Sequence, residues 1–153
     1  DDSDPTIEPV KKMWETFGMQ IEYMKADHHD RVLAMTSHVP QLIAYSIVAT
    51  ATELEEHTRA EVIKYSAAGF RDFTRLAGSD PIMWRDVYLR NKDAVLEMLG
   101  RFMEDLTSLQ KAIRINDTAL LEKMFTSTRE IRKLIENAGQ AGSFDPTENI
   151  EKN

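Results

Sequence analysis

Two stretches of the 153-residue chain place polar and ionisable side chains on segments that otherwise resemble buried helices. The first runs from His28 to Gln41 and the second from Ala68 to Arg75. Burying a neutral polar group without a partner costs about 1–3 kcal/mol, and burying a charge costs more, so these side chains need partners or a ligand. We interpret the two stretches as one wall of an anion-binding active site whose other wall lies outside this chain.

The first stretch has a polar stripe at helical spacing. The stripe carries Asp30, Ala34, His38 and Gln41, and Ser37 lies beside it. Such a stripe can bind a polar ligand or a metal ion. The pair His29-Asp30 is typical of metal-dependent phosphohydrolases, but that site also needs a further histidine and a distant aspartate, which the sequence does not place. We therefore predict no metal site and keep the phosphohydrolase as a minor alternative.

The histidines also have simpler interpretations. His28 is expected to be solvated at a helix N-terminus, and His57, among several glutamates, is expected on the surface. A core histidine with satisfied hydrogen bonds is the alternative for His38. Pro40 frees the carbonyl group of Thr36 and should kink the helix, which would present nearby side chains at the break.

The second stretch contains a charged pair on an aromatic-rich helix. Asp72 and Arg75 are three residues apart, so the carboxylate can hold the guanidinium in place. A guanidinium among Phe70, Phe73 and Trp84 would bind a carboxylate strongly and directionally, because it offers paired donors in a poorly screened setting. The alternative is an intrahelical salt bridge that binds nothing.

Nucleotide-binding and hydrolase motifs are missing from the sequence. The six glycines lie at positions 18, 69, 78, 100, 139 and 142, so neither a dinucleotide fingerprint nor a P-loop is present. There is also no Gly-x-Ser-x-Gly elbow and no His-Glu-x-x-His pair. The sequence argues against a nucleotide-dependent enzyme that is complete within this chain.

The amino-acid composition limits the classes of partner and the cellular compartment that we expect. The formal net charge is −7, with 26 acidic and 19 basic residues, so we expect no nucleic-acid partner. The absence of cysteine excludes disulfides and is compatible with a reducing compartment, and we expect a cytoplasmic protein. No apolar run approaches the roughly 18 residues of a membrane span, so we expect no membrane association.

The N-terminal part predicts a helix and then a strand. A helix is expected from Asp4-Pro5 to Gly18, and residues 19–24 alternate as in a short strand. A lone strand leaves its backbone groups unpaired, so we assign residues 1–25 to the end of an upstream α/β domain. The chain also lacks an initiator methionine and a signal peptide, which favours a piece excised from a longer protein.

After Lys25 the sequence predicts about five helices. The first runs from about Asp27 to Ala51 with an interruption at Pro40, and the second opens with a capping box at Thr58 and ends at Gly78. A short helix starts at Pro81, a long one is capped by Asn91, and the last runs from Asp117 to Gly139. We thus predict an all-helical domain over residues 26–139 and a disordered tail over residues 140–153.

Three motifs, in order, strongly resemble the prephenate/arogenate (cyclohexadienyl) dehydrogenases of tyrosine biosynthesis over roughly residues 5–138. They are His29-Asp30-x3-Ala34-x2-Ser37-His38-x-Pro40, Gly69-Phe70-Arg71-Asp72-Phe73-Thr74-Arg75-Leu76-Ala77 and Ser79-Asp80-Pro81-Ile82-Met83-Trp84-Arg85-Asp86. The resemblance implies an N-terminal Rossmann domain that binds NAD or NADP, and an all-helical C-terminal domain that supplies the homodimer interface and half of the substrate cleft. Residues 1–25 would then be the helix–strand remnant of the Rossmann domain.

The resemblance also implies a reaction and residue roles. The family oxidises the ring alcohol of prephenate or arogenate by hydride transfer while carbon dioxide leaves, so that prephenate gives 4-hydroxyphenylpyruvate. Arg75 would bind a substrate carboxylate, and Asp72 would orient Arg75. Ser37 and His38 would line the substrate cleft, with Trp84 nearby. The catalytic histidine would lie in the missing domain, so we expect no catalytic residue here and no activity from this piece alone.

Two departures from the family pattern affect regulation. Many members have histidine at the position of Gln41 and glycine at the position of Ala68. These positions and His38 are associated with feedback by L-tyrosine and with substrate preference. Inhibition by tyrosine and the choice between prephenate and arogenate therefore stay open, as does the choice between NAD and NADP. A stand-alone helical dimer that binds tyrosine or a related carboxylate is the alternative function.

Overall fold

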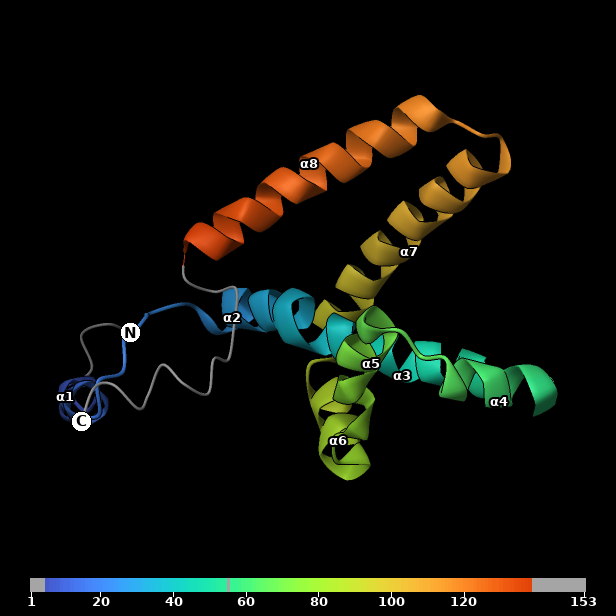
Figure 1. Cartoon of the computed structure of the whole chain (residues 1–153). Helices are drawn as coiled ribbons and strands as arrows, with labels where there is room; N and C mark the ends of the chain where they lie inside the picture. Colours follow the sequence, from blue (N-terminus) through green and yellow to red (C-terminus); the bar gives the residue numbers. More distant parts are fainter. Residues whose placement is uncertain (1–4, 55, 139–153) are drawn as a thin grey trace, which may run out of the picture. The chain divides into compact units, whose positions relative to one another are not determined.

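The computed structural model describes residues 5–54 and 56–138, which form helices joined by turns (Figure 1). The chain divides into two compact units, residues 1–101 and residues 102–153, and each is described by itself. The described residues contain no strand. The predicted mainly α fold is confirmed, whereas the division at residues 25 and 139 stays a prediction.

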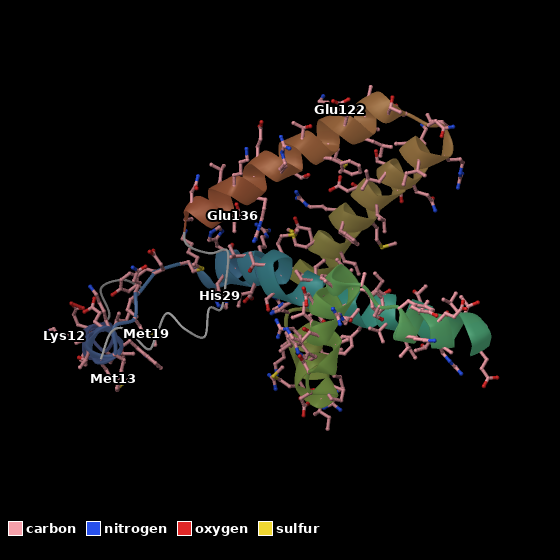
Figure 2. The ribbon with its side chains drawn as sticks, viewed as in Figure 1. Lys12, Met13, Met19, His29, Glu122 and Glu136 are labelled. Carbon is pink, nitrogen blue, oxygen red and sulfur yellow. The ribbon has the colours of Figure 1, made fainter. Side chains whose placement is uncertain are left out.

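Helix α1 spans Ile7–Thr16 and stops at Gly18, whose φ of +78° is favourable for glycine. Its apolar side chains are largely exposed, and Figure 2 shows Met13 and Met19 projecting from this segment. The strand predicted at residues 19–24 is wrong, because residues 19–25 have no regular secondary structure. The alternating pattern was present, but the described residues offer no second strand to pair with its backbone.

The centre of the first unit is one continuous helical rod. It consists of α2 (Ala26–Leu33), the π-helical turn η1 (Ala34–His38) and α3 (Val39–Thr52). Pro40 lacks an N–H for the carbonyl of Thr36, and the helix widens by one residue per turn directly before it. The irregularity predicted at Pro40 takes the form of this π turn, which ends at His38, and the helix continues through Pro40 without a break. The helix starts at Ala26 after Lys25, so Asp27 is not its N-cap.

Small residues on this rod allow close packing. Ala34, Val39 and Ala44 are buried, and α5, η2 and α4 pack against α3. The rod spans Ala26–Thr52 and contains an 18-residue window with a mean hydropathy of 1.4, so it is long and apolar enough to cross a membrane by length and composition. This corrects the prediction that no segment approaches that length. The core helix of a soluble protein meets the same criterion, and this helix carries the packing centre of its unit.

The segment after the rod forms three short elements in place of one predicted helix. They are α4 (Glu56–Lys64), α5 (Ala68–Thr74) and the 3-10 turn η2 (Arg75–Gly78). The break between α4 and α5 follows Lys64, where the Ser66 hydroxyl donates to the carbonyl of Val62 at 2.7 Å. Helix α4 begins before Thr58, so the predicted capping box at Thr58 is wrong.

The remaining helices begin where their capping residues predict. Helix α6 spans Pro81–Arg90, and the Asp80 carboxylate accepts from the Met83 amide at 2.8 Å. Helix α7 spans Lys92–Arg114 and α8 spans Thr118–Asn137, with Asp117 accepting from the Leu120 amide at 3.0 Å. The predicted stop at Gly139 and the predicted disorder of residues 140–153 lie outside the described residues.

Candidate functional site

His38 closes the π turn and is only 8% exposed. Three side chains hold His38 in place: two from α6 and one from Asn91, the residue directly after that helix. The Tyr88 hydroxyl donates to the backbone carbonyl of His38 at 3.3 Å, and the Asn91 amide nitrogen lies 3.2 Å from His38 Nδ1. The Trp84 and His38 rings meet edge to face, with 6.0 Å between centroids. Tyr88 therefore holds the backbone of His38, Asn91 contacts one nitrogen of its ring, and Trp84 packs against one side of the ring.

Burial keeps the ionisable groups of this cluster neutral. It lowers the pKa of His38 below its usual value, while the nearby Asp30 carboxylate opposes this effect and His29 adds slightly to it. Burial, helped by Tyr45, raises the pKa of Tyr88 to about 12. A neutral imidazole and a neutral phenol are thus the forms present near pH 7.

Trp84 provides a free donor in the cluster. Its indole Nε1–H is fully buried and finds no acceptor among the described residues. The indole ring also contacts the ring of Tyr88, at 5.7 Å between centroids. A buried donor without an acceptor costs about 1–3 kcal/mol, so this N–H is suited to an acceptor atom supplied from outside the described chain.

Gln41 anchors the turn that carries Arg75. Its side chain is 2% exposed, and Nε2 donates to the carbonyl of Leu76 at 2.6 Å. One turn further along α3, the Tyr45 hydroxyl donates to the carbonyl of Ser79 at 3.1 Å. Two side chains of α3 thus fix η2 close to Arg75, whose own side chain is exposed. The family resemblance associates this position with feedback by tyrosine. In this structure the Gln41 side chain holds the fold together through its hydrogen bond to Leu76.

The predicted pairing of Asp72 with Arg75 is not seen. Both side chains are exposed, and within residues 5–54 and 56–138 no ion pair or aromatic stacking involves the Arg75 guanidinium. Ala68 lies exposed at the start of α5, and Ser37 is half-buried in η1. The structure thus brings His38 to Trp84 and Gln41 to the turn of Arg75. It does not join Asp72 to Arg75.

Sequence reasoning missed Tyr45, Tyr88 and the second role of Asn91. A signal existed for two of them, because Trp84, Tyr88 and Asn91 follow one another at spacings of four and three residues. Such spacing places three polar-tipped side chains on one helical face. Tyr45 is one turn beyond Gln41 and could have been found in the same way.

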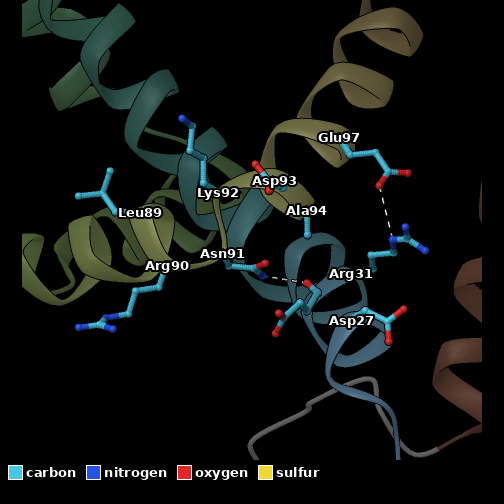
Figure 3. Close-up of a pocket in the computed structure, with 10 residues that line it drawn as sticks. Asp27, Arg31, Leu89, Arg90, Asn91, Lys92, Asp93, Ala94 and Glu97 are labelled. Carbon is cyan, nitrogen blue, oxygen red and sulfur yellow. Dashed lines mark hydrogen bonds and ion pairs between the residues drawn. The ribbon is translucent and has the colours of Figure 1, made fainter.

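A charged cleft of about 490 Å³ lies beside this cluster, between α2 and the junction of α6 with α7 (Figure 3). Its lining carries both signs of charge: Asp27, Asp30, Arg31, Arg90, Lys92, Asp93 and Glu97. Arg31 Nε lies 3.5 Å from a Glu97 carboxylate oxygen, and Asn91 Nδ2 donates to the Asp30 carbonyl at 2.8 Å. Asn91 therefore connects the cleft with His38.

The described residues offer no cluster of three or more potential metal ligands. His29 Nδ1 lies 3.2 Å from Asp30 Oδ1, and both side chains are about half exposed. This pair occurs without the further histidine and aspartate that a phosphohydrolase site requires, and the metal alternative gains no support from the part of the chain described.

The helices and the buried polar cluster formed by η1, α3 and α6 define an all-α domain distinct from a nucleotide-binding fold. Residues 25–127 match the family model for the prephenate dehydrogenase dimerization domain. The chain belongs to this family, and the resemblance of its three motifs is confirmed.

Relatives in sequence are dehydrogenases. The cyclohexadienyl dehydrogenase of Zymomonas mobilis is 41% identical over 123 residues, which cover 80% of this chain and 42% of that protein. The prephenate dehydrogenase of Bacillus subtilis is 30% identical over 126 residues, covering 82% of this chain and 34% of that protein. The chain thus spans less than half the length of these relatives.

Solved structures have the same fold. A crystal structure of prephenate dehydrogenase from Aquifex aeolicus superposes with a TM-score of 0.79 at 31% identity, covering 87% of this chain and 46% of that chain. The A. aeolicus enzyme in complex with hydroxyphenyl propionate and NAD+ gives 0.74 at 35% identity, covering 84% and 45%. Synechocystis arogenate dehydrogenase, at 21% identity and 0.77, covers 86% and 48% and shows the shared fold alone.

Proposed function

We propose that this chain is the C-terminal part of a prephenate or arogenate dehydrogenase, and that it supplies one wall of the substrate cleft and the homodimer interface. The complete protein would oxidise the ring alcohol of the substrate as carbon dioxide leaves, and prephenate would give 4-hydroxyphenylpyruvate. The observation that carries this proposal is the family match over residues 25–127. On this basis the protein would act in the cytoplasm.

The nicotinamide cofactor does not fit the residues of this chain. No three of its six glycines have the spacing of a dinucleotide fingerprint, and the described residues contain no strand to precede one. We therefore assign the binding of NAD or NADP, and the catalytic histidine, to a part of the protein outside this chain. The residues of the chain itself would bind the substrate and form the dimer.

Arg75 is the proposed carboxylate-binding residue. Its backbone is held because Gln41 and Tyr45 bind the carbonyls of the neighbouring Leu76 and of Ser79. Its guanidinium has no acidic partner among the described residues and can form a paired, charge-assisted contact with a substrate carboxylate. We propose that Asp72 orients this guanidinium once the substrate is bound.

Together with Arg75, the side chains of His38, Ser37 and Trp84 would line the proposed substrate cleft. The unpaired indole N–H of Trp84 supports this role, because a substrate oxygen would satisfy a donor that is otherwise left without an acceptor. If L-tyrosine inhibits the protein, we propose that it acts at this cleft, where His38, Gln41 and Ala68 are the positions to vary.

A homodimer is supported by the apolar surface of the second unit. Large apolar side chains there are more than half exposed: Met103, Leu106, Ile113, Phe125, Ile131 and Leu134. Repeated exposure of this kind along a helix is typical of a surface that a partner covers. We propose that a second copy of the chain covers it.

The test is an assay of the complete protein, together with this 153-residue chain alone. Incubation with prephenate or arogenate and NAD+ or NADP+ should reduce the cofactor and form the decarboxylated aromatic product only with the complete protein. A complete protein that binds the cofactor yet turns over neither substrate would refute the proposal. The substrate and cofactor preferred in this assay would also decide the two open choices.

A further inference from the structure

Asn91 touches two elements that lie far from it in the sequence. It follows α6, and its side-chain nitrogen Nδ2 lies 2.8 Å from the backbone carbonyl oxygen of Asp30 in α2. The same nitrogen lies 3.2 Å from Nδ1 of His38, 53 residues away. Figure 3 shows the Asn91 amide turned towards the carbonyl that it binds. One amide group therefore bridges α2 and the end of the π turn.

The first contact fixes which way round the amide lies. A backbone carbonyl oxygen can only accept a hydrogen bond, so the atom 2.8 Å from it must be the NH2 group of Asn91 and not its carbonyl oxygen. An NH2 group has two hydrogens, and the second is available for the contact with His38. The Asn91 nitrogen is thus a donor in both contacts.

The second contact then fixes the protonation of the imidazole. A donor facing Nδ1 at 3.2 Å needs a lone pair on Nδ1, so Nδ1 carries no proton. In a neutral imidazole the single proton must then lie on Nε2. A doubly protonated ring would set one N–H against another, which opposes protonation. No acceptor for Nε2 is found among the described residues.

We propose that Asn91 is a positioning residue that holds His38 as the neutral Nε2–H tautomer and so turns its Nε2–H into a donor for a substrate oxygen. This inference rests on the proposed function for the identity of that oxygen, which belongs to a carboxylate or hydroxyl of the substrate. Tyr88 and Trp84 support the same orientation, because they hold the backbone and one side of the ring. The donor would lie beside the unpaired N–H of Trp84.

The charged surroundings of His38 agree with this tautomer. From α2, the Asp30 carboxylate favours a protonated ring and His29 disfavours it, but burial is the largest effect and lowers the pKa of His38. From α6, Tyr88 remains protonated because its pKa is raised to about 12. Asn91 adds no charge, and it selects between the two neutral tautomers.

The first experiment reads the tautomer directly in the 153-residue chain with 15N-labelled histidine. Long-range proton–nitrogen spectra distinguish a protonated from an unprotonated ring nitrogen, and His38→Gln identifies the signals of this residue among the four histidines. We expect His38 to show a bare Nδ1 and a protonated Nε2 near neutral pH. A proton on Nδ1, or an imidazolium, would overturn the proposal, and this wild-type spectrum decides even if a variant fails to fold.

Variants at position 91 test the cause. Asn91→Asp replaces the donor by an acceptor, which should move the proton to Nδ1 and raise the midpoint of the His38 titration by about one pH unit or more. Asn91→Ala should give a mixture of both tautomers. Lys92→Ala is the matched control. Lys92 follows Asn91 and lines the charged cleft of Figure 3 without a contact to His38, so the spectrum of this variant should equal that of the wild type. Unchanged His38 signals in both Asn91 variants would refute the role of Asn91.

The complete protein separates this inference from the proposed function. With prephenate as substrate, Asn91→Asp should raise KM about 10-fold or more, because the hydrogen bond from His38 Nε2–H to the substrate would be lost. Lys92→Ala should leave KM unchanged. A bare Nδ1 in a protein without dehydrogenase activity would keep the tautomer and refute the proposed function. Dehydrogenase activity in a protein whose His38 carries its proton on Nδ1 would keep the proposed function and refute the tautomer.

Discussion

Gln41 and Leu76 are joined across 35 residues by a 2.6 Å hydrogen bond from the side-chain amide of one to the backbone carbonyl of the other. The amide comes from the core helix α3, and the carbonyl belongs to the 3-10 turn that begins with Arg75. This bond ties Gln41, which is only 2% exposed, to the residue that follows Arg75, the residue proposed to bind substrate. The site therefore depends on the same contacts that hold the fold.

Removing this bond should destabilise the chain. In Gln41→Leu the carbonyl of Leu76 would lose the donor from α3 and keep those of the Ser79 amide and hydroxyl, so we expect a loss of about 0.5–1.5 kcal/mol in the free energy of unfolding. Urea unfolding followed by circular dichroism measures this loss. Gln110→Leu is the control, because Gln110 is exposed on α7. Equal stability of the two variants would contradict the role given to Gln41.

Arg75 should matter for substrate binding more than for stability. Arg75→Ala in the complete protein should lower kcat/KM about 10- to 100-fold, chiefly through KM, because one charge-assisted contact is lost. Arg71→Ala, an exposed arginine one turn earlier in the chain, should leave both constants close to wild type. Steady-state kinetics with prephenate checks both variants. An Arg75→Ala enzyme with wild-type kcat and KM would remove Arg75 from the site.

Much of the helical structure follows from local patterns. The capping residues Asp80 and Asp117 predict the starts of α6 and α8, and Pro40 predicts the irregular turn in the central helix, because each acts through its immediate neighbours. The predicted pair Asp72 and Arg75 is not formed although the two residues are three apart on helical backbone; both side chains are exposed, where an ion pair gains little free energy. The contacts from Gln41 to Leu76 and from Asn91 to His38 depend on tertiary packing, which spacing along the sequence does not reveal.

Trp84 should show opposite effects on stability and on binding. Trp84→Phe keeps an aromatic ring but removes the buried N–H that has no acceptor among the described residues. Without substrate, this should leave stability unchanged or raise it by about 1 kcal/mol, because an unsatisfied donor is removed. With prephenate, KM should rise several-fold if the N–H donates to the substrate. A lower stability together with an unchanged KM would show that the indole serves only as packing.

The stability of the first unit should fall on both sides of neutral pH. The pKa of His38 is lower in the folded chain than its usual 6.5, so the unfolded chain binds a proton more readily and stability decreases as pH falls below about 6.5. The pKa of Tyr88 is raised from 10.0 to about 12, so the unfolded chain loses its proton first and stability decreases as pH rises from 10 to 12. Lowering the pH below about 6.5 and raising it above 10 should therefore both reduce the free energy of unfolding.

Urea midpoints measured across pH test these two slopes separately. Tyr88→Phe should flatten the alkaline side and leave the acid side unchanged, and His38→Gln should do the opposite. Tyr23→Phe serves as the control for the phenol, because Tyr23 is exposed in the segment after α1. If Tyr88→Phe kept the full alkaline slope, the buried phenol would not be its cause.

The apolar face of α8 should determine the oligomeric state. Phe125 is 57% exposed in the isolated chain, and burial of a large aromatic side chain at an interface contributes strongly to association. Phe125→Glu should convert a dimer into a monomer at micromolar concentration, as measured by sedimentation equilibrium. Lys123→Glu places the same charge on an exposed position of the same helix and should leave the dimer intact. A wild-type chain that sediments as a monomer would require another partner for this face, and a Phe125→Glu dimer would place the interface elsewhere.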